Sequence, residues 1–173
     1  GAMSAGRSFA RRLTHRRGGN FSLGFRLLPR AKRRAVYAAY AVCRVGDDIV
    51  DESGDAPPGE VLARLDAWAC EVGEAYRGRA SHPATVALAE VLPDYPIPQA
   101  AFLGLIDGCR LDLTKLRYRE FAELEHYCEL VAVTISDISL SIFGTMSAAA
   151  GAFGRHLAIA LQLTNICRDV GED

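Results

Sequence analysis

Apolar residues recur three and four positions apart along almost the whole chain, which is the spacing of an α-helical face. The spacing predicts helices over residues 31–51, 58–76, 82–92, 98–113 and 120–143, and a last helix from about residue 149 to the end. Ser53–Gly59 and Gly78–Pro83 are expected to be turns, and Gly144 is expected to end the fifth helix. No useful length of chain alternates apolar and polar residues. The sequence therefore predicts an all-α fold.

The predicted helix over residues 120–143 has the most regular apolar stripe. Its members are Phe121, Leu124, Cys128, Val131, Ile135, Ile138 and Ile142. Such a stripe is typical of a helix that packs one face on a core.

Two other helices carry polar stripes that amphipathicity alone does not explain. On the first, a single face presents Tyr37, Tyr40, Arg44, Asp47 and Asp51, with Asp48 beside it. On the last, a single face presents Gln162, Asn165, Asp169 and Asp173, with Arg168 and Glu172 alongside. Both helices are otherwise apolar nearly all round, so we expect the stripes to line a buried site rather than a solvated surface.

Paired carboxylates in a buried site favour a metal-binding function. Carboxylates four residues apart lie about 6 Å apart along a helix axis. Burial and like charge both oppose their ionisation, and a divalent cation relieves that conflict. Mg²⁺ commonly bridges one or two carboxylates to phosphate oxygens, and an arginine can bind the same phosphate group. Either motif alone is more often a solvated acidic face; the two together favour a metal–diphosphate site.

Composition excludes several other classes of protein. The 173 residues are 50% hydrophobic and 24% charged with a net charge of −1, which suits one folded domain and does not indicate nucleic-acid binding. The five cysteines, Cys43, Cys70, Cys109, Cys128 and Cys167, contain no C-x-x-C pair, so we expect reduced, mostly core-packed thiols rather than a zinc site. The four histidines have no metal-ligand spacing, and no apolar run is long enough to span a membrane.

The basic residues are concentrated at the N-terminus. Residues 1–34 contain ten Arg or Lys residues and no Asp or Glu. We predict that residues 1–20 form a flexible basic arm, beginning with a tag-cleavage scar at Gly1–Met3, and that residues 21–173 form one helical domain. A solvated terminus is the simplest interpretation; the alternative is contact with anionic lipid or a polyanionic substrate. Cytoplasmic localisation, with peripheral membrane contact through this arm, is the corresponding expectation.

The two acidic stripes resemble a known family. Residues 37–51, YAAYAVCRVGDDIVD, resemble the first aspartate-rich motif of squalene and phytoene synthases, and residues 162–173, QLTNICRDVGED, are similar to the second. Between them, RLDLTKLRY (110–118) and FAELEHYC (121–128) look like the middle section of the family. The resemblance extends over roughly residues 21–173. It implies a helical isoprenoid-synthase bundle around a central cavity, truncated here at the C-terminus.

The resemblance also implies roles for individual residues. Asp47, Asp51, Asp169 and Asp173 would be Mg²⁺ ligands, with Asp48 and Asn165 supporting them. Arg44, Arg168 and Gln162 would contact the diphosphate or its metal shell. Tyr40 and Tyr127 would line the reacting centre, and Phe21 would lie at a flap near the entrance. The alternative for the three aromatic residues is ordinary core packing.

The implied reaction is the head-to-head joining of two allylic isoprenoid diphosphates, farnesyl or geranylgeranyl, through a cyclopropyl diphosphate to a squalene- or phytoene-type product. The sequence leaves open which product forms and whether NADPH is required. Val133 and Ser136 stand where many members have glycine, which predicts a stiffer helix and a narrower tunnel. We also expect the truncated chain to be inactive, and either to self-associate or to rearrange its packing.

Two alternatives compete with this interpretation. A chain-elongating prenyltransferase or a terpene cyclase would share the helical architecture and acidic helices, although the ending DVGED after Q-x-x-N argues against both. A non-catalytic helical subunit that binds lipid diphosphates or a partner protein belongs to a different class. Magnesium-dependent turnover of farnesyl diphosphate would distinguish that subunit from an enzyme.

Overall fold

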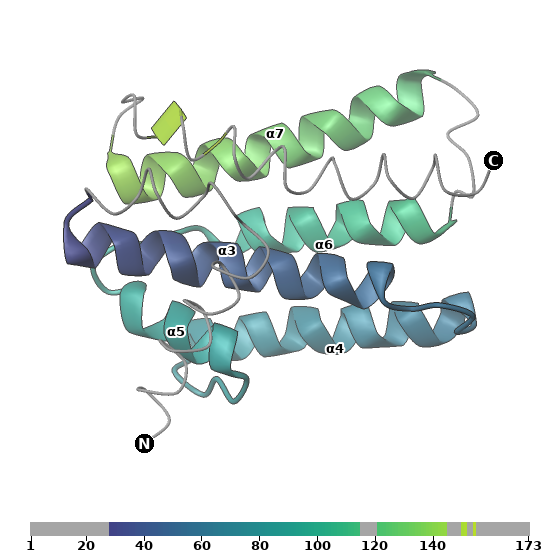
Figure 1. The fold of residues 1–173 in the computed structure, drawn as a ribbon, viewed down its shortest axis with the longest axis horizontal. Coiled ribbons are helices and arrows are strands. Elements are labelled where there is room, and N and C mark those ends of the chain that lie inside the picture. Colours follow the sequence, from purple (N-terminus) through teal and green to yellow (C-terminus); the bar gives the residue numbers. More distant parts are fainter. Residues whose placement is uncertain (1–27, 115–120, 145–149, 152–153, 155–173) are drawn as a thin grey trace.

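The computed structural model describes residues 28–114, 121–144, 150–151 and 154. Its elements are α3 (Arg30–Asp51), α4 (Pro58–Tyr76), α5 (Pro83–Val91), α6 (Gln99–Thr114) and α7 (Phe121–Phe143), as Figure 1 shows. Every regular element among the described residues is a helix, so the all-α prediction is confirmed. Each boundary lies within one residue of its predicted position. Of the predicted last helix, residues 150, 151 and 154 are helical, and the rest lies outside the described residues.

The helix with the first acidic stripe, α3, lies at the centre of the described bundle. It packs against α4, α5, α6 and α7 and runs across the middle of Figure 1. Nearly every residue from Ala35 to Cys43 is fully buried, including the large side chain of Tyr40. This environment explains why the helix is apolar on all sides, and it makes the polar residues at its C-terminal end unusual.

Proline and glycine set the helix ends. Pro29 precedes α3 with extended backbone, and Pro58 occupies the first turn of α4, where its missing N–H costs nothing. Gly144 ends α7 with φ of 75°, and its N–H donates a 2.8 Å hydrogen bond to the carbonyl of Leu140. The predicted loop Ser53–Gly59 is too long by two residues, because Pro58 and Gly59 belong to α4.

A single carboxylate joins α4 to the start of α5. Glu71 accepts hydrogen bonds from the backbone N–H groups of Ser81 and His82 and from the hydroxyls of Ser81 and Thr85, at 2.6–2.9 Å. Burial raises the pKa of Glu71, but these hydrogen bonds outweigh it and lower the pKa to about 2. His82 is the N-cap of α5, and its Nδ1 accepts from the N–H of Ala84 at 3.1 Å.

Helices α6 and α7 approach each other closely at one point. The Thr134 hydroxyl donates a buried 3.0 Å hydrogen bond to the carbonyl of Ala101, and a Cβ on Gly104 would lie 3.4 Å from that hydroxyl oxygen. Val131, Ile135, Ile138 and Ile142 are buried, which confirms the described half of the predicted apolar stripe.

The opposite face of α7 is exposed. Val133 is 59% exposed and Leu140 is 42% exposed, and Ser136 lies on the same face. Val133 and Ser136 therefore do not pack against the described helices. The narrowing of a tunnel by these two residues stays a prediction.

The described cysteines divide into two groups. Cys43 and Cys109 are buried free thiols, as expected of most of the cysteines, whereas Cys70 is an exposed free thiol. Cys70 follows the apolar pair Trp68–Ala69 in sequence, but it lies on the outer face of α4. No described helix is both long enough and apolar enough to cross a membrane.

Candidate active site

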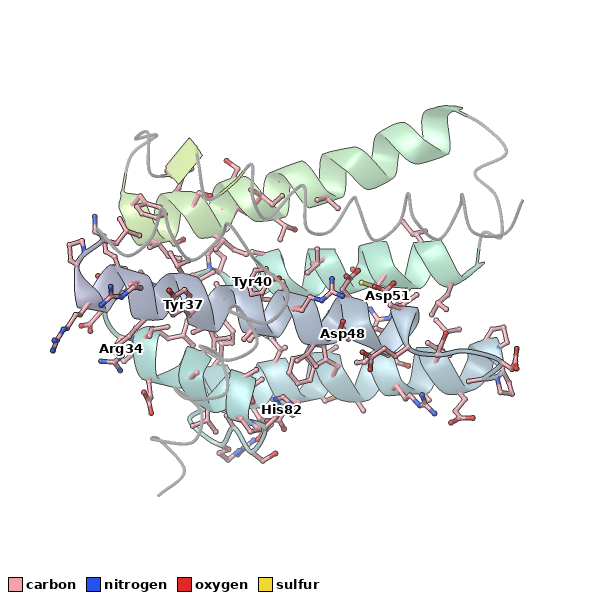
Figure 2. All side chains as sticks on the ribbon, in the orientation of Figure 1. Arg34, Tyr37, Tyr40, Asp48, Asp51 and His82 are labelled. Atoms are coloured by element: carbon pink, nitrogen blue, oxygen red, sulfur yellow. The ribbon has the colours of Figure 1, made fainter. Side chains whose placement is uncertain are left out.

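The C-terminal half of α3 brings the first predicted stripe to one place. Arg44 and Asp47 are buried, and Asp48 and Asp51 are mostly shielded from solvent. Figure 2 labels Tyr37, Tyr40, Asp48 and Asp51 along this helix. Successive members of the stripe are three or four residues apart, so the α-helix places them on one face independently of tertiary contacts.

One guanidinium contacts all three carboxylates. Arg44 Nη1 lies 2.8 Å from Asp47 Oδ2, and Arg44 Nη2 lies 2.8 Å from Asp48 Oδ1 and 3.7 Å from Asp51 Oδ2. Only 8% of the Arg44 side chain and 7% of the Asp47 side chain are exposed. Ion pairs this buried are costly to desolvate and are weak evidence for stability alone, so a functional reason for them is expected.

The neighbouring tyrosine and cysteine stay protonated at neutral pH. Burial raises the pKa of the Tyr40 hydroxyl; Arg44 partly opposes this, and Asp48 and Asp47 reinforce it. Burial and the nearby Asp47 raise the pKa of Cys43 to about 12. Tyr40 can therefore donate a hydrogen bond but is a poor base, and Cys43 is not a nucleophile.

Helix α4 packs closely against α3 within the motif. Gly46 lies between Arg44 and Asp47 in sequence, and a Cβ there would lie 3.5 Å from the Trp68 ring and 3.9 Å from Ile106. Trp68 in turn makes an edge-on contact with the His82 ring, with centroids 4.9 Å apart. The contact between Gly46 and Trp68 joins two different helices and was not predicted from the sequence. Its only sequence signal was a glycine inside an otherwise strong helix.

The donor set fits Mg²⁺ of the kind that is shared with a phosphate group. Asp47, Asp48 and Asp51 offer hard carboxylate oxygens, the ligand type that Mg²⁺ prefers. Within the described ranges, no group of three acidic, histidine or cysteine side chains is arranged to hold a metal unaided. Mg²⁺ is commonly held by one or two carboxylates together with phosphate oxygens of a substrate, and the carboxylates of this motif suit such a shared site.

The remaining predicted site residues lie beyond what the structure describes. Phe21 and the whole second motif, with Gln162, Asn165, Arg168, Asp169 and Asp173, fall outside the described residues. Tyr127 is in α7, but its side chain is also outside them. The roles assigned to these residues, and the opposition of the two acidic stripes across one cavity, stay predictions.

A helical bundle with a buried aspartate-rich motif on its central helix is the arrangement expected of an isoprenoid synthase. The family model for squalene/phytoene synthase matches residues 14–173, and the chain belongs to that family.

Relatives and solved structures agree with this assignment. The phytoene synthase of Mycobacterium tuberculosis is 44% identical over 154 residues, which are 89% of this chain and 50% of that protein. The presqualene diphosphate synthase of Rhodopseudomonas palustris is 36% identical over 157 residues, 90% of this chain and 55% of that protein.

The crystal structure of squalene synthase HpnC from Alicyclobacillus acidocaldarius matches with a TM-score of 0.71 at 32% identity, over 92% of this chain and 62% of that one. The predicted isoprenoid-synthase fold is therefore confirmed. The chain spans about half the length of the curated relatives it matches.

Proposed function

We propose that this chain forms part of a head-to-head prenyltransferase that condenses two allylic isoprenoid diphosphates into a phytoene- or squalene-type product. The observation that carries the proposal is the buried cluster in which Arg44 contacts Asp47, Asp48 and Asp51. Family membership over residues 14–173 supports the reaction type.

The cluster suits the departure of a diphosphate. The C1–O bond of one allylic substrate breaks, and the electron pair leaves with the diphosphate. The double bond of the second substrate attacks the carbocation, and loss of a proton closes a cyclopropane ring. A second ionisation releases the second diphosphate, and the cation rearranges. Loss of a proton from the rearranged cation gives a phytoene-type product, whereas transfer of a hydride from NADPH gives a squalene-type product. Mg²⁺, when bound, supplies positive charge that stabilises the leaving diphosphate.

The residues of this chain would bind the metal and the diphosphate and exclude water. Asp47 and Asp51 would hold the metal, with Asp48 beside them, and the guanidinium of Arg44 would bind the diphosphate through its paired N–H groups. Tyr40, buried one turn before Arg44, would donate a hydrogen bond near the reacting centre without removing a proton. The apolar surroundings of α3 would keep water from the carbocation.

The second motif would complete the site from the opposite side. In this proposal Asp169 and Asp173 hold further Mg²⁺, Asn165 supports them, and Gln162 and Arg168 contact the diphosphate. Tyr127 lines the reacting centre, and Phe21 lies near the entrance. Membrane contact through the basic arm and cytoplasmic localisation also stay predictions.

Product analysis tests the proposal. The full-length enzyme would be incubated with farnesyl or geranylgeranyl diphosphate and Mg²⁺, with and without NADPH. A product with twice the carbon number of the substrate, formed only with the divalent metal, is expected. Binding without turnover would instead support the non-catalytic subunit, and hydrolysis without condensation would contradict the proposed reaction. A cyclised product would support a terpene cyclase. A chain lengthened by five carbons, in a parallel incubation with added isopentenyl diphosphate, would support a chain-elongating prenyltransferase.

A further inference from the structure

The arrangement of Arg44 raises a question about how metal enters the site. Both terminal nitrogens of one guanidinium are engaged with the carboxylates that the proposed function assigns to Mg²⁺. Arg44 and its partner Asp47 are buried in the C-terminal part of α3.

A metal ion and Arg44 would compete for the same oxygens. Two cations within a few ångströms of each other repel strongly where solvent screening is weak. Asp47 already accepts a hydrogen bond from the guanidinium, and Asp48 and Asp51 form ion pairs with it. A divalent cation that arrives without diphosphate would therefore approach carboxylates whose negative charge Arg44 already partly neutralises.

A diphosphate changes this balance. Its oxygens match the planar fork of a guanidinium as well as a carboxylate does, and they also supply metal ligands. Helix α3 packs against four helices, so the exchange would be made by rotation of the Arg44 side chain while the helix backbone stays in place. Metal and diphosphate would then each remove an obstacle to the binding of the other.

We propose that Arg44 is an internal counterion that holds the carboxylates of the first motif until Mg²⁺ and diphosphate arrive together, so that the two bind cooperatively and the metal alone binds weakly. This inference rests on the proposed function, because it takes the same three carboxylates as the metal site. It adds that Arg44 opposes metal binding in one state and favours it in the other.

Titration calorimetry of the full-length protein tests the inference. Mg²⁺ would be titrated into the wild type and into Arg44→Gln, first alone and then with inorganic diphosphate present. We expect Arg44→Gln to bind Mg²⁺ alone about tenfold more tightly than the wild type, a coupling of ordinary size for two linked sites. We also expect diphosphate to increase the Mg²⁺ affinity less in Arg44→Gln than in the wild type.

Two further variants make the result specific. Arg64→Gln removes the same charge from an exposed i,i+4 pair with Glu60 on α4, so it should leave the Mg²⁺ affinity unchanged. Arg44→Lys keeps the charge but lacks the fork that reaches three carboxylates, so it should fall between the wild type and Arg44→Gln. Fluorescence emission from Trp68, the single tryptophan, would show whether Arg44→Gln folds. If it does not fold, Arg44→Lys provides the test.

The outcomes separate the two proposals. If Arg44→Gln and Arg44→Lys bind Mg²⁺ alone no more tightly than the wild type, the counterion role is wrong even if the enzyme is active. If the wild type shows no Mg²⁺ binding with diphosphate and no turnover, the proposed function itself fails.

Discussion

At the scale of single residues, the first motif makes a direct prediction. Asp47→Ala removes a proposed metal ligand and also leaves Arg44 with fewer buried partners. We expect turnover of the full-length enzyme to fall by roughly two orders of magnitude or more, as for the loss of other electrostatic transition-state contacts. The fold should survive, because Asp48 and Asp51 remain to pair Arg44.

Steady-state kinetics and a thermal melt would be measured together. Asp55→Ala, in the exposed turn after α3, is the matched control and should change neither quantity. Normal turnover in Asp47→Ala would contradict the assignment, and a large loss of Tm would point to a structural role instead.

A second residue-scale prediction concerns His82 and pH. Burial lowers the pKa of His82, and Glu71 only partly offsets this. Protonation would also remove the acceptor that receives the Ala84 N–H. The unfolded chain binds this proton more readily, so the free energy of unfolding falls as the pH drops below about 6.5 and stops falling below the lowered pKa of the folded state. The pKa of Glu71 in the folded protein is also lowered. The stability that Glu71 contributes is therefore lost only as the pH falls from its usual pKa of about 4.5 towards about 2.

The variant His82→Asn distinguishes the contribution of His82 to the pH dependence of stability from that of Glu71. Asparagine is a good N-cap and does not titrate. Between pH 7.5 and 5.5 we expect the Tm of the wild type to fall by a few degrees more than that of the variant. An equal fall in both proteins would show that His82 does not carry the pH dependence.

The sequence predicted the members of the first motif because the geometry is local. Spacings of three and four place Arg44, Asp47 and Asp51 on one face of any α-helix. The contact of Gly46 with Trp68 could not be predicted in the same way, since the two residues belong to different helices and nothing in their spacing links them. Likewise, the exposure of Cys70 depends on which face of α4 meets α6, and that is set by tertiary packing.

At the scale of elements, Gly46 offers a test of how α3 and α4 pack. Glycine costs about 1 kcal/mol relative to alanine in a helix interior. A Cβ at this position would make ordinary contacts of 3.5 Å with Trp68 rather than a clash. We therefore expect Gly46→Ala to raise the Tm by about 2–4 °C.

A bulkier residue should have the opposite effect. The side chain of Gly46→Leu would overlap the Trp68 ring and Ile106, and overpacking of this kind costs about 1–3 kcal/mol. Differential scanning calorimetry of the two variants checks both signs. A lower Tm for Gly46→Ala would mean that α3 and α4 lie closer together than the structure places them.

The helix boundaries were predictable for reasons that also lie within each element. Prolines at positions 29, 58, 83 and 98 lie before or within the first turns of α3, α4, α5 and α6, and Gly144 ends α7 with positive φ. The attachment of α5 to α4 was not predictable, because it depends on Glu71 reaching residues ten to fourteen positions later in the chain.

At the scale of the whole molecule, the helical class followed from periodicity and the family from two long motifs. The arrangement of the helices around α3 did not, because a face that is apolar on all sides does not specify its neighbours. Whether the second motif faces the first is a question of the same kind. It concerns residues more than a hundred positions apart, and local spacing cannot answer it.

The exposed face of α7 leads to the last prediction. Val133 and Leu140 lie on one side of this helix, and both are unusually exposed for apolar side chains. Exposed apolar side chains on one helix face favour association. The chain also spans only about half the length of its curated relatives. We therefore expect the 173-residue chain by itself to self-associate and to show no turnover.

Sedimentation velocity and a turnover assay, run beside the full-length enzyme, check both expectations. Replacing Val133 and Leu140 together by lysine should shift the 173-residue chain towards the monomer without restoring turnover, because the substitution removes the apolar face but adds nothing to the site. Ser136→Lys on the same face adds charge without removing an apolar side chain, so it should reduce association less. A monomeric wild-type chain with turnover comparable to the full-length enzyme would show that residues 1–173 already enclose a working cavity.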